Sequence, residues 1–198
     1  PESWKGHVET MEKAGIESWF IDSCAKIKYM FPKAHAAAYV ISAFRIAWYK
    51  VHMPAYYYAS WFSTKATDFN VDAMIKGYDA IKETLLEIES KGYEATNKEN
   101  GISESLKLAL EATARGMKFL NVSLNNSEST VWIVKDDNSI YPPFNAIDGL
   151  GDTVAQNIVE ERKIRPFISI EDLQKRAKIS QTLIDKMRIM GVFEGMPE

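Results

Sequence analysis

The sequence has 198 residues, a net charge of −3 and a hydrophobic share of 46%. These totals favour a packed core over a disordered chain and make no overall case for a nucleic-acid-binding protein. However, the segment from Ser23 to Thr67 carries no acidic residue, and a bound phosphate responds to local charge rather than to the total. The basic residues of this acid-free segment are Lys26, Lys28, Lys33, Arg45, Lys50 and Lys65.

Some classes of site are excluded by composition. The single cysteine, Cys24, cannot form an internal disulfide, which fits a reducing, cytoplasmic location. The apolar run 36–62 is interrupted by charged residues and a proline, so we expect no membrane span. His35 and His52 are far apart and have no carboxylate nearby, so we expect no metal site there. Because the chain begins at Pro1, we expect a piece of a longer protein.

The first half of the chain reads as helical. We expect helices within residues 1–30 with a break near Gly15, and then a helix from Pro32 to about His52 that stops at Pro54. A short aromatic segment, AYYYASWFS, and a turn at 68–70 follow. Apolar residues at helical spacing then predict one helix over Val71–Ser90, ended by Lys91 and Gly92.

The second half changes its pattern twice. We expect a polar loop at 95–101, a helix over Ile102–Gly116, and a small β hairpin within 121–144 with turns at 125–126 and 136–138. Helices return from Asn145. The predicted fold is therefore mainly α, with one small β hairpin.

The helix after Pro32 has two different faces. On the helical wheel, the face centred on His35 carries mainly aromatic and hydroxyl side chains. Arg45 and His52 flank this face on one edge, and Lys50 flanks it on the other. Its members are His35, Tyr39, Ser42, Ile46 and Tyr49. The opposite face is an apolar stripe that we expect to be buried, formed by Ala37, Val40, Ile41, Phe44, Ala47, Trp48 and Val51.

The basic-aromatic face of this helix has two interpretations. Lysine and arginine can bind phosphates while tyrosine or histidine rings stack on a base, which would make it a nucleotide or nucleic-acid surface. A solvated amphipathic helix with tyrosines at its rim is the alternative. The absence of acidic residues favours the first, since an ordinary solvated face mixes both signs, but the pattern alone leaves both open.

A second informative stretch is FNAIDGLGDTVAQNIVEERKIR, residues 144–165. Gly149 and Gly151 would allow unusual backbone dihedrals in a tight turn and would let a phosphate reach N–H groups at the following helix start. Thr153 would add a hydroxyl. The pattern is typical of a helix-hairpin-helix, which grips the DNA backbone without reading sequence. A glycine-turned helix pair used only for packing is the alternative.

A related half follows in FISIEDLQKRAKISQTLIDKMRIMGVF. Ser169 with Asp172 three residues later predicts a capped helix start, followed by a turn near 178–181 and a helix ending at Gly191. This second turn lacks the Gly-x-Gly core, so we expect it to bind phosphate less well than the first turn.

Catalytic machinery is missing from the sequence. Two-metal phosphoryl transfer needs closely spaced carboxylates, and phosphate-binding loops and nucleophile elbows each have a characteristic glycine pattern. We find none of these patterns in the sequence. The candidate carboxylates read as turn or helix-start residues: Asp68, Asp72, Asp136, Asp137 and Asp148. We therefore predict a binding segment without catalytic or metal-ligating residues.

Several ordered segments together resemble the alpha subunits of bacterial DNA polymerase III, of the PolC type found in low-GC Gram-positive bacteria. Residues 21–63, with the core PKAHAAAY, resemble the fingers region of that family. The segments DAMIKGYDAI, PPFNAIDGLGDTVAQNIVEER and FISIEDLQKRAKISQTLIDKMRIMGVFEGMPE are also similar to PolC. The resemblance covers nearly the whole chain; residues 1–15 and 94–101 match weakly.

The resemblance implies a replicative DNA polymerase that extends a primer on a template with deoxynucleoside triphosphates and Mg²⁺. Its catalytic aspartates would lie upstream in a palm domain, outside this sequence. The family's fingers helix lies over the incoming nucleotide, which implies contacts from Lys33, His35, Tyr39, Ser42 and Arg45, with Lys26 and Lys28 as secondary candidates. Its tandem helix-hairpin-helix holds the duplex, which implies backbone contacts at Gly149, Leu150, Gly151, Asp152 and Thr153.

On this resemblance the chain divides into fingers helices (1–66), a helical fingers extension (67–120), a small β hairpin (121–144) and a tandem helix-hairpin-helix (145–198). The implied partners are primer–template DNA, a dNTP and other replisome subunits. The family's glutamine-led motif for the sliding clamp is not reached before Glu198, so no clamp binding is assigned. We expect the chain alone to be inactive. The alternatives are a standalone, non-catalytic helix-hairpin-helix module and a protein–protein scaffold.

Overall fold

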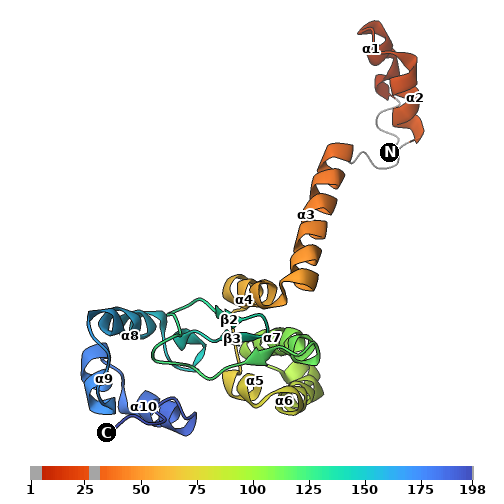
Figure 1. The fold of residues 1–198 in the computed structure, drawn as a ribbon. Helices are drawn as coiled ribbons and strands as arrows, with labels where there is room; N and C mark the ends of the chain where they lie inside the picture. Colours follow the sequence, from red (N-terminus) through yellow and green to blue (C-terminus); the bar gives the residue numbers. More distant parts are fainter. Residues whose placement is uncertain (1–5, 27–31, 198) are drawn as a thin grey trace. The chain divides into compact units, whose positions relative to one another are not determined.

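The computed structural model describes residues 6–26 and 32–197 and separates into two units, 1–47 and 48–198 (Figure 1). The described residues are mainly helical with one small three-stranded sheet, which confirms the predicted fold class. Lys28, one of the secondary candidates, lies outside the described residues.

The first unit contains α1 (Val8–Lys13), α2 (Ser18–Lys26) and most of α3 (Lys33–His52). Gly15 lies between α1 and α2 with a φ of 75°, so the predicted helix break is confirmed. Helix α3 begins directly after Pro32 and ends at His52, also as predicted. Proline suits this position because a first-turn residue needs no N–H donor.

The aromatic segment after His52 is a helix of its own, α4 (Pro54–Thr64). Pro54 therefore both ends α3 and occupies the first turn of α4. The face of α4 formed by Ala55, Tyr58, Ala59 and Phe62 is buried and begins the core of the second unit.

The single helix predicted over Val71–Ser90 is wrong, because the chain forms α5 (Val71–Lys76) and α6 (Tyr78–Ser90). Gly77 separates them with φ 95° and ψ −162°. This conformation interrupts the helical hydrogen bonding and is unfavourable for any residue that has a Cβ. Met74 and Ile81 are nevertheless both buried, so the apolar spacing that suggested one helix serves two.

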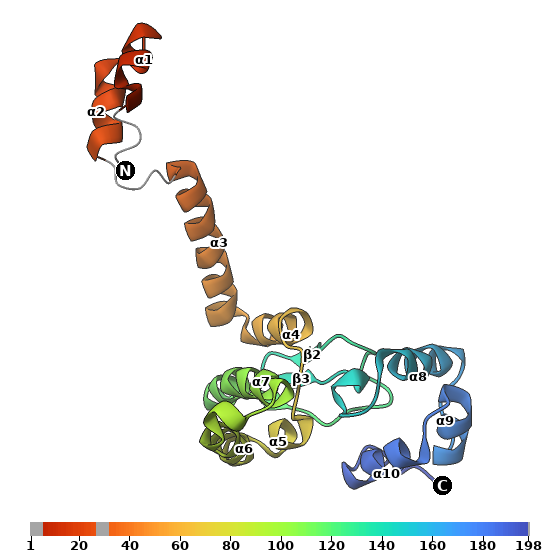
Figure 2. The same cartoon turned by 180° about the vertical axis from the view of Figure 1, so that it is seen from behind.

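The polar loop predicted at 95–101 is also shorter than expected. A short 3₁₀ turn, η2 (Gly92–Glu94), precedes α7 (Asn97–Ala114), whose start is fixed by a capping box. The Thr96 hydroxyl accepts from the Glu99 N–H, and the Glu99 carboxylate accepts from the Thr96 N–H at 2.8 Å. Two otherwise unpaired donors are satisfied, so the helix starts five positions before Ile102. Helices α6 and α7 lie side by side (Figures 1 and 2).

The sheet contains β1 (Lys118–Phe119), β2 (Ile133–Asp136) and β3 (Ser139–Tyr141) in the order β1-β3-β2. Strands β2 and β3 form the predicted antiparallel hairpin around Asp137 and Asn138. Strand β1 pairs with β3 in parallel, which was not predicted because two residues after a helix carry no strand periodicity.

An aromatic cluster joins α4 to the sheet. The ring centroid of Phe62 lies 5.5 Å from that of Phe119 and 5.1 Å from that of Trp132, and Phe69 lies 5.4 Å from Trp132. Phe62 is 1% exposed. This cluster holds the fold because buried aromatic side chains contribute the largest apolar areas to a core.

The C-terminal part consists of η3 (Phe144–Ala146), α8 (Asp152–Ile164), α9 (Ile170–Ala177) and α10 (Gln181–Ile189). Within the second unit, α8 and α9 lie on the other side of the sheet from α6 and α7 (Figure 2), whereas α10 shares a pocket with the starts of α5 and α7. Their buried residues continue the same core: Ala155, Ile158, Val159, Ile170, Leu173, Ala177, Ile184 and Met187.

Candidate nucleic-acid interface

The turn before α8 is anchored by two buried apolar side chains, Ile147 and Leu150, which are 1% and 2% exposed. The Leu150 N–H donates to the Ile147 carbonyl at 2.9 Å and closes the turn. Gly149 lies between them with a φ of 87°, where a glycine is favoured because it has no Cβ. Leu150 therefore holds the hairpin on the core with its side chain, and only its backbone remains for a ligand.

Gly151 is not in an unusual conformation, contrary to the sequence-based expectation. Its φ of −75° and ψ of 161° are ordinary for the residue that precedes a helix, and a Cβ added there would meet nothing within 4 Å. What distinguishes Gly151 is that it provides no side-chain cap to α8. The first-turn N–H groups of α8 therefore have no capping acceptor from this residue and can face an external anion.

Asp152 and Thr153, the first two residues of α8, are both exposed. The Asn145 amide donates to the Asp152 carboxylate at 3.0 Å, which ties that side chain back to the turn. A carboxylate cannot donate to a phosphate, so only the backbone of Asp152 suits the predicted contact, whereas the Thr153 hydroxyl can donate.

The second hairpin repeats the backbone of the first. Lys178 takes the left-handed conformation at φ 56° and ψ 46°, Ile179 is buried, and Ser180 precedes α10 with φ −69° and ψ 153°. These three positions correspond to Gly149, Leu150 and Gly151. The difference is chemical, since the Ser180 hydroxyl accepts from the Leu183 N–H and caps α10 internally.

The predicted cap at Ser169 is confirmed, because its hydroxyl accepts from the Asp172 N–H at 3.1 Å. Of the three helices in this part of the chain, α9 and α10 thus begin with a serine cap and α8 does not. The hairpin at 147–153 is accordingly the better candidate for a phosphate, which agrees with the ranking from sequence.

Not every basic residue near the hairpins is available to a ligand. The Arg162 guanidinium donates to the carbonyls of Leu124 and Ser127 at 2.9 and 2.7 Å and ties α8 to the segment between β1 and β2. Arg176 pairs with Glu161 and Asp172, and its guanidinium lies 4.6 Å from the Phe167 ring centroid. Both arginine side chains are mostly buried and support the fold.

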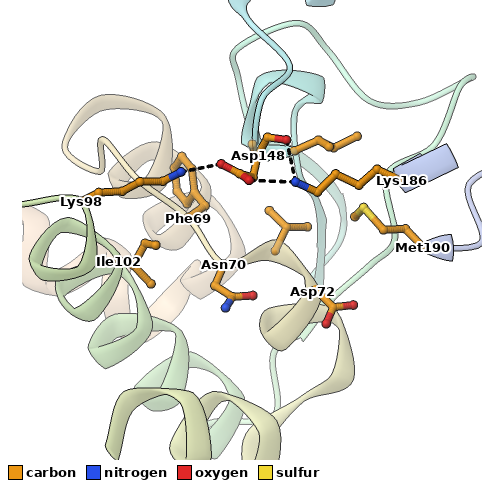
Figure 3. A pocket seen from close by; sticks show the side chains of 11 residues that line it. Phe69, Asn70, Asp72, Lys98, Ile102, Asp148, Lys186 and Met190 are labelled. Carbon is orange, nitrogen blue, oxygen red and sulfur yellow. Dashed lines mark hydrogen bonds and ion pairs between the residues drawn. The ribbon is translucent and has the colours of Figure 1, made fainter. Parts of the chain in front are cut away.

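A charged cluster beside the first hairpin was missed in the sequence. Asp148 pairs with Lys98 of α7, and it accepts from Lys186 of α10 at 2.8 Å through both its carboxylate and its backbone carbonyl. Hydrogen bonds from Lys186 and then Lys98 lower the pKa of Asp148 to about 2. Figure 3 shows Asp148 between the two lysines at the edge of a pocket of about 300 Å³. From the sequence alone Asp148 was interpreted as a turn residue, because its two lysine partners are 50 and 38 positions away.

Helix α3 carries five of the predicted nucleotide contacts on one continuous helix: Lys33, His35, Tyr39, Ser42 and Arg45, all exposed. The His35 and Tyr39 ring centroids are 4.4 Å apart. Lys26 is separate from them, in the last turn of α2.

The expected burial of the apolar stripe of α3 is wrong, since no residue of this helix is buried. Phe44 is 72% exposed and Trp48 is 52% exposed. The amphipathic pattern predicts which face prefers burial, but burial also requires a second apolar surface that packs against this face.

Lys50 also differs from its expected place on the edge of a ligand-facing surface. Its ammonium lies 2.8 Å from the carboxylate of Glu111 on α7 and 5.3 Å from the Tyr57 ring centroid. The hydroxyl of Tyr58 donates to the same carboxylate at 3.3 Å. Burial, and next the charge of Glu111, raise the pKa of Tyr58 to about 12. Lys50 is therefore part of a structural network between the end of α3 and α7.

Two classes of site can be checked within the described ranges. Residues 6–26 and 32–197 contain no group of three or more histidine, cysteine, aspartate or glutamate side chains that could hold a metal ion. In the same ranges, the helices are all too short or too polar to cross a membrane.

Comparison with known proteins agrees with these features. A family model described as a helix-hairpin-helix motif matches residues 116–198. The "DNA polymerase III PolC-type" of Halalkalibacterium halodurans is 49% identical over 96% of this chain and 13% of its own length. Proteins of the same name from Bacillus subtilis and Listeria innocua are both 48% identical, over 96% and 98% of this chain.

The alignment covers nearly all of this chain but only a small part of each relative, because the chain spans about 13–14% of the length of these curated relatives. The similarity nevertheless runs through nearly all of its residues and includes both α3 and the hairpins. The chain is therefore a segment of the PolC-type DNA polymerase III family and contains a helix-hairpin-helix motif.

Proposed function

We propose that this chain is the part of a replicative DNA polymerase that holds duplex DNA at residues 149–153 and contacts the incoming nucleotide and template through α3. The longer protein would transfer nucleotides from dNTPs to a DNA primer. This activity is proposed from the relatives, which are named as DNA polymerases and are about seven times longer than the chain.

The observation that carries the DNA-binding part is the uncapped start of α8. Its first-turn N–H groups and the positive end of the helix dipole favour a phosphate oxygen. Gly149 and Gly151 are exposed and present no side chain that would keep a backbone phosphate away. Such a contact fixes the position of the duplex without reading its sequence.

The nucleotide-facing part is supported by the chemistry of α3. Lys33 and Arg45 supply cations for a triphosphate or a template backbone, and Arg45 can engage two phosphate oxygens at once. The exposed Tyr39 ring, beside His35, offers a surface on which a base can stack. Ser42 adds a hydroxyl donor on the same face, and Lys26 and Lys28 remain secondary candidates.

The remaining assignments follow from the same proposal. Residues 1–66 would be fingers helices, 67–120 their helical extension, 121–144 the β hairpin region and 145–198 the tandem helix-hairpin-helix. The catalytic aspartates that bind Mg²⁺ would lie in another part of the longer protein, and other replisome subunits would be contacted through that longer protein. We expect the isolated chain to extend no primer.

The experiment that tests the DNA-binding part is the substitution Gly151→Asp. Asp is a favoured residue before a helix and would cap α8, so the fold should be kept or stabilised. Its carboxylate would also occupy the N–H groups that the phosphate needs. Losing one hydrogen bond to a charged group, about 1.5 kcal/mol, corresponds to about tenfold weaker binding of a fluorescent primer–template duplex.

The matched control is Ser169→Asp, which adds the same charge at the capped start of α9. Its duplex affinity should stay close to that of the unmodified chain. Equal losses in both variants would indicate a general charge effect and would contradict a specific contact at the hairpin.

Two further measurements separate the alternatives. A protein–protein scaffold should show no salt-dependent affinity for DNA. A standalone DNA module should tolerate His35→Ala, whereas a polymerase that includes this segment should need a higher dNTP concentration after Arg45→Ala or Lys33→Ala.

A further inference from the structure

The pocket beside the first hairpin is formed by three elements that are distant in the sequence. Residues from the start of α5, from α7 and from α10 converge with the hairpin turn around it (Figure 3). Its apolar wall includes Phe69, Ile102 and Met190, and its rim carries charged side chains.

The rim carries an excess of positive charge at one place. Lys98 and Lys186 approach Asp148 from opposite sides, so two ammonium groups share one carboxylate (Figure 3). The other carboxylate of the lining, Asp72, pairs with Lys76 on its own helix at 2.5 Å. The three groups Lys98, Asp148 and Lys186 therefore carry a net charge of one positive unit, and the carboxylate of Asp68 is a further negative charge that acts on Lys98.

The cluster is accessible and adjoins the proposed phosphate site. The side chains of Lys98, Asp148 and Lys186 are each about half exposed, at 58%, 56% and 41%. Asp148 is followed directly by Gly149, so its two lysines are held next to the hairpin at which a DNA backbone would lie. A strand bound there presents further phosphates at intervals of about 3.4 Å along the helix axis.

We propose that Lys98 and Lys186 form a second contact for DNA backbone phosphates beside the hairpin, and that Asp148 is the resident anion that keeps both lysines in place until DNA replaces it. This inference rests on the proposed binding of duplex DNA at residues 149–153. It adds residues from α7 and α10 to that site and assigns to Asp148 a restraining role.

The exchange is physically favourable because exposed ion pairs are weak and a phosphate offers the same oxygen acceptors as a carboxylate. Moving an ammonium from Asp148 to a phosphate also releases a cation condensed on the DNA, which drives binding at low salt. Lys186 keeps a second bond to the Asp148 carbonyl, so its stem stays beside the hairpin during the exchange.

The test compares duplex binding by the whole chain over a range of salt concentrations, using Lys98→Gln, Lys186→Gln and Asp148→Asn. Each lysine substitution should reduce the slope of log affinity against log salt by about 0.9, the value for one lost phosphate contact on B-DNA. Asp148→Asn should bind the duplex several-fold more tightly, because it removes the competing anion while keeping the size of the side chain.

The matched control is Lys107→Gln. Lys107 lies on α7 like Lys98, has the same 58% side-chain exposure, and pairs with Glu89 away from the pocket. Its slope should equal that of the unmodified chain. Circular dichroism melting of each variant separates a loss of contacts from a loss of fold.

Unchanged slopes for both Lys98→Gln and Lys186→Gln would overturn the inference, as would weaker binding by a folded Asp148→Asn, which would make Asp148 only a support of the turn. Failure of the proposed function looks different. In that case the unmodified chain binds no duplex, or Gly151→Asp binds as well as the unmodified chain.

Discussion

The two glycines of the first hairpin provide the sharpest test of how this site is built, because they lie two positions apart and differ in backbone conformation. Gly149 has a φ of 87°, whereas Gly151 has a φ of −75°. Replacing each with alanine adds the same single methyl group. We expect Gly149→Ala to destabilise the fold and Gly151→Ala to leave its stability almost unchanged.

The magnitude follows from strain rather than from steric overlap. A Cβ at Gly149 would have Leu183 Cδ2 as its nearest neighbour at 3.8 Å, an ordinary contact. The left-handed conformation costs a residue with a Cβ about 1–2 kcal/mol, and the lower entropy of the unfolded alanine chain returns about 0.4–1 kcal/mol. The free energy of unfolding should fall by about 1 kcal/mol, equivalent to about 2–4 °C in melting temperature.

At Gly151 the corresponding terms nearly cancel. Its backbone is suited to any residue and a Cβ would meet nothing within 4 Å, so there is no strain. Alanine is a slightly poorer residue than glycine before a helix, and this offsets its smaller unfolded-state entropy. The net change should lie within about 0.5 kcal/mol.

Urea unfolding followed by tryptophan fluorescence measures both variants, with Trp132 as a buried reporter of the second unit. The midpoint should fall for Gly149→Ala with an unchanged m-value. Duplex binding adds a second readout, since a methyl group at Gly151 obstructs a phosphate without unfolding the turn. Equal stabilities, or a larger loss at Gly151 than at Gly149, would refute this account of the hairpin.

Three further predictions concern the core, the second hairpin and the charged cluster. Phe62→Ala should lower the free energy of unfolding by about 3–5 kcal/mol in urea titration, because the buried ring contacts Phe119 and Trp132; a loss under about 1 kcal/mol would contradict its central place. Lys178→Gly should raise the free energy of unfolding by about 0.5–1 kcal/mol, since φ 56° is strained for lysine, and a lower midpoint would argue against that strain. Asp148 should titrate at about 2 by carboxyl NMR, against about 3.9 when unfolded. Its stabilising effect is then complete above the unfolded pKa and is lost as the pH falls towards 2; a measured pKa near 3.9 would show that the lysine pairs do not persist in solution.

Local signals in the sequence were reliable where one short stretch decides the structure. Pro32 and Gly15 marked a helix start and a helix break, and Ser169 marked a cap, since each acts through its own backbone or its nearest neighbours. The capping box of Thr96 and Glu99 was equally readable but was overlooked within a polar segment. Gly77 was passed over because apolar spacing continued on both sides of it.

Long-range pairs were not readable in the same way. Lys50 appeared to belong to a basic surface until Glu111, 61 positions later, proved to be its partner. Asp148 appeared to be a turn residue until Lys98 and Lys186 were found around it. A charge in a sequence has a sign and a position but no partner, and the partner decides whether the charge is structural or available to a ligand.

The sequence by itself determined the helical fold class, the hairpin pattern at residues 147–153 and the family to which the segment belongs, because these depend on spacing and on ordered motifs. Only the tertiary structure decided that Gly149 but not Gly151 needs a positive φ, that α8 alone among the last three helices starts without a side-chain cap, and that two distant lysines meet at Asp148. The physical reason is that backbone strain, capping and ion pairing depend on where atoms meet after folding, and residues tens of positions apart are brought together only by the packed core.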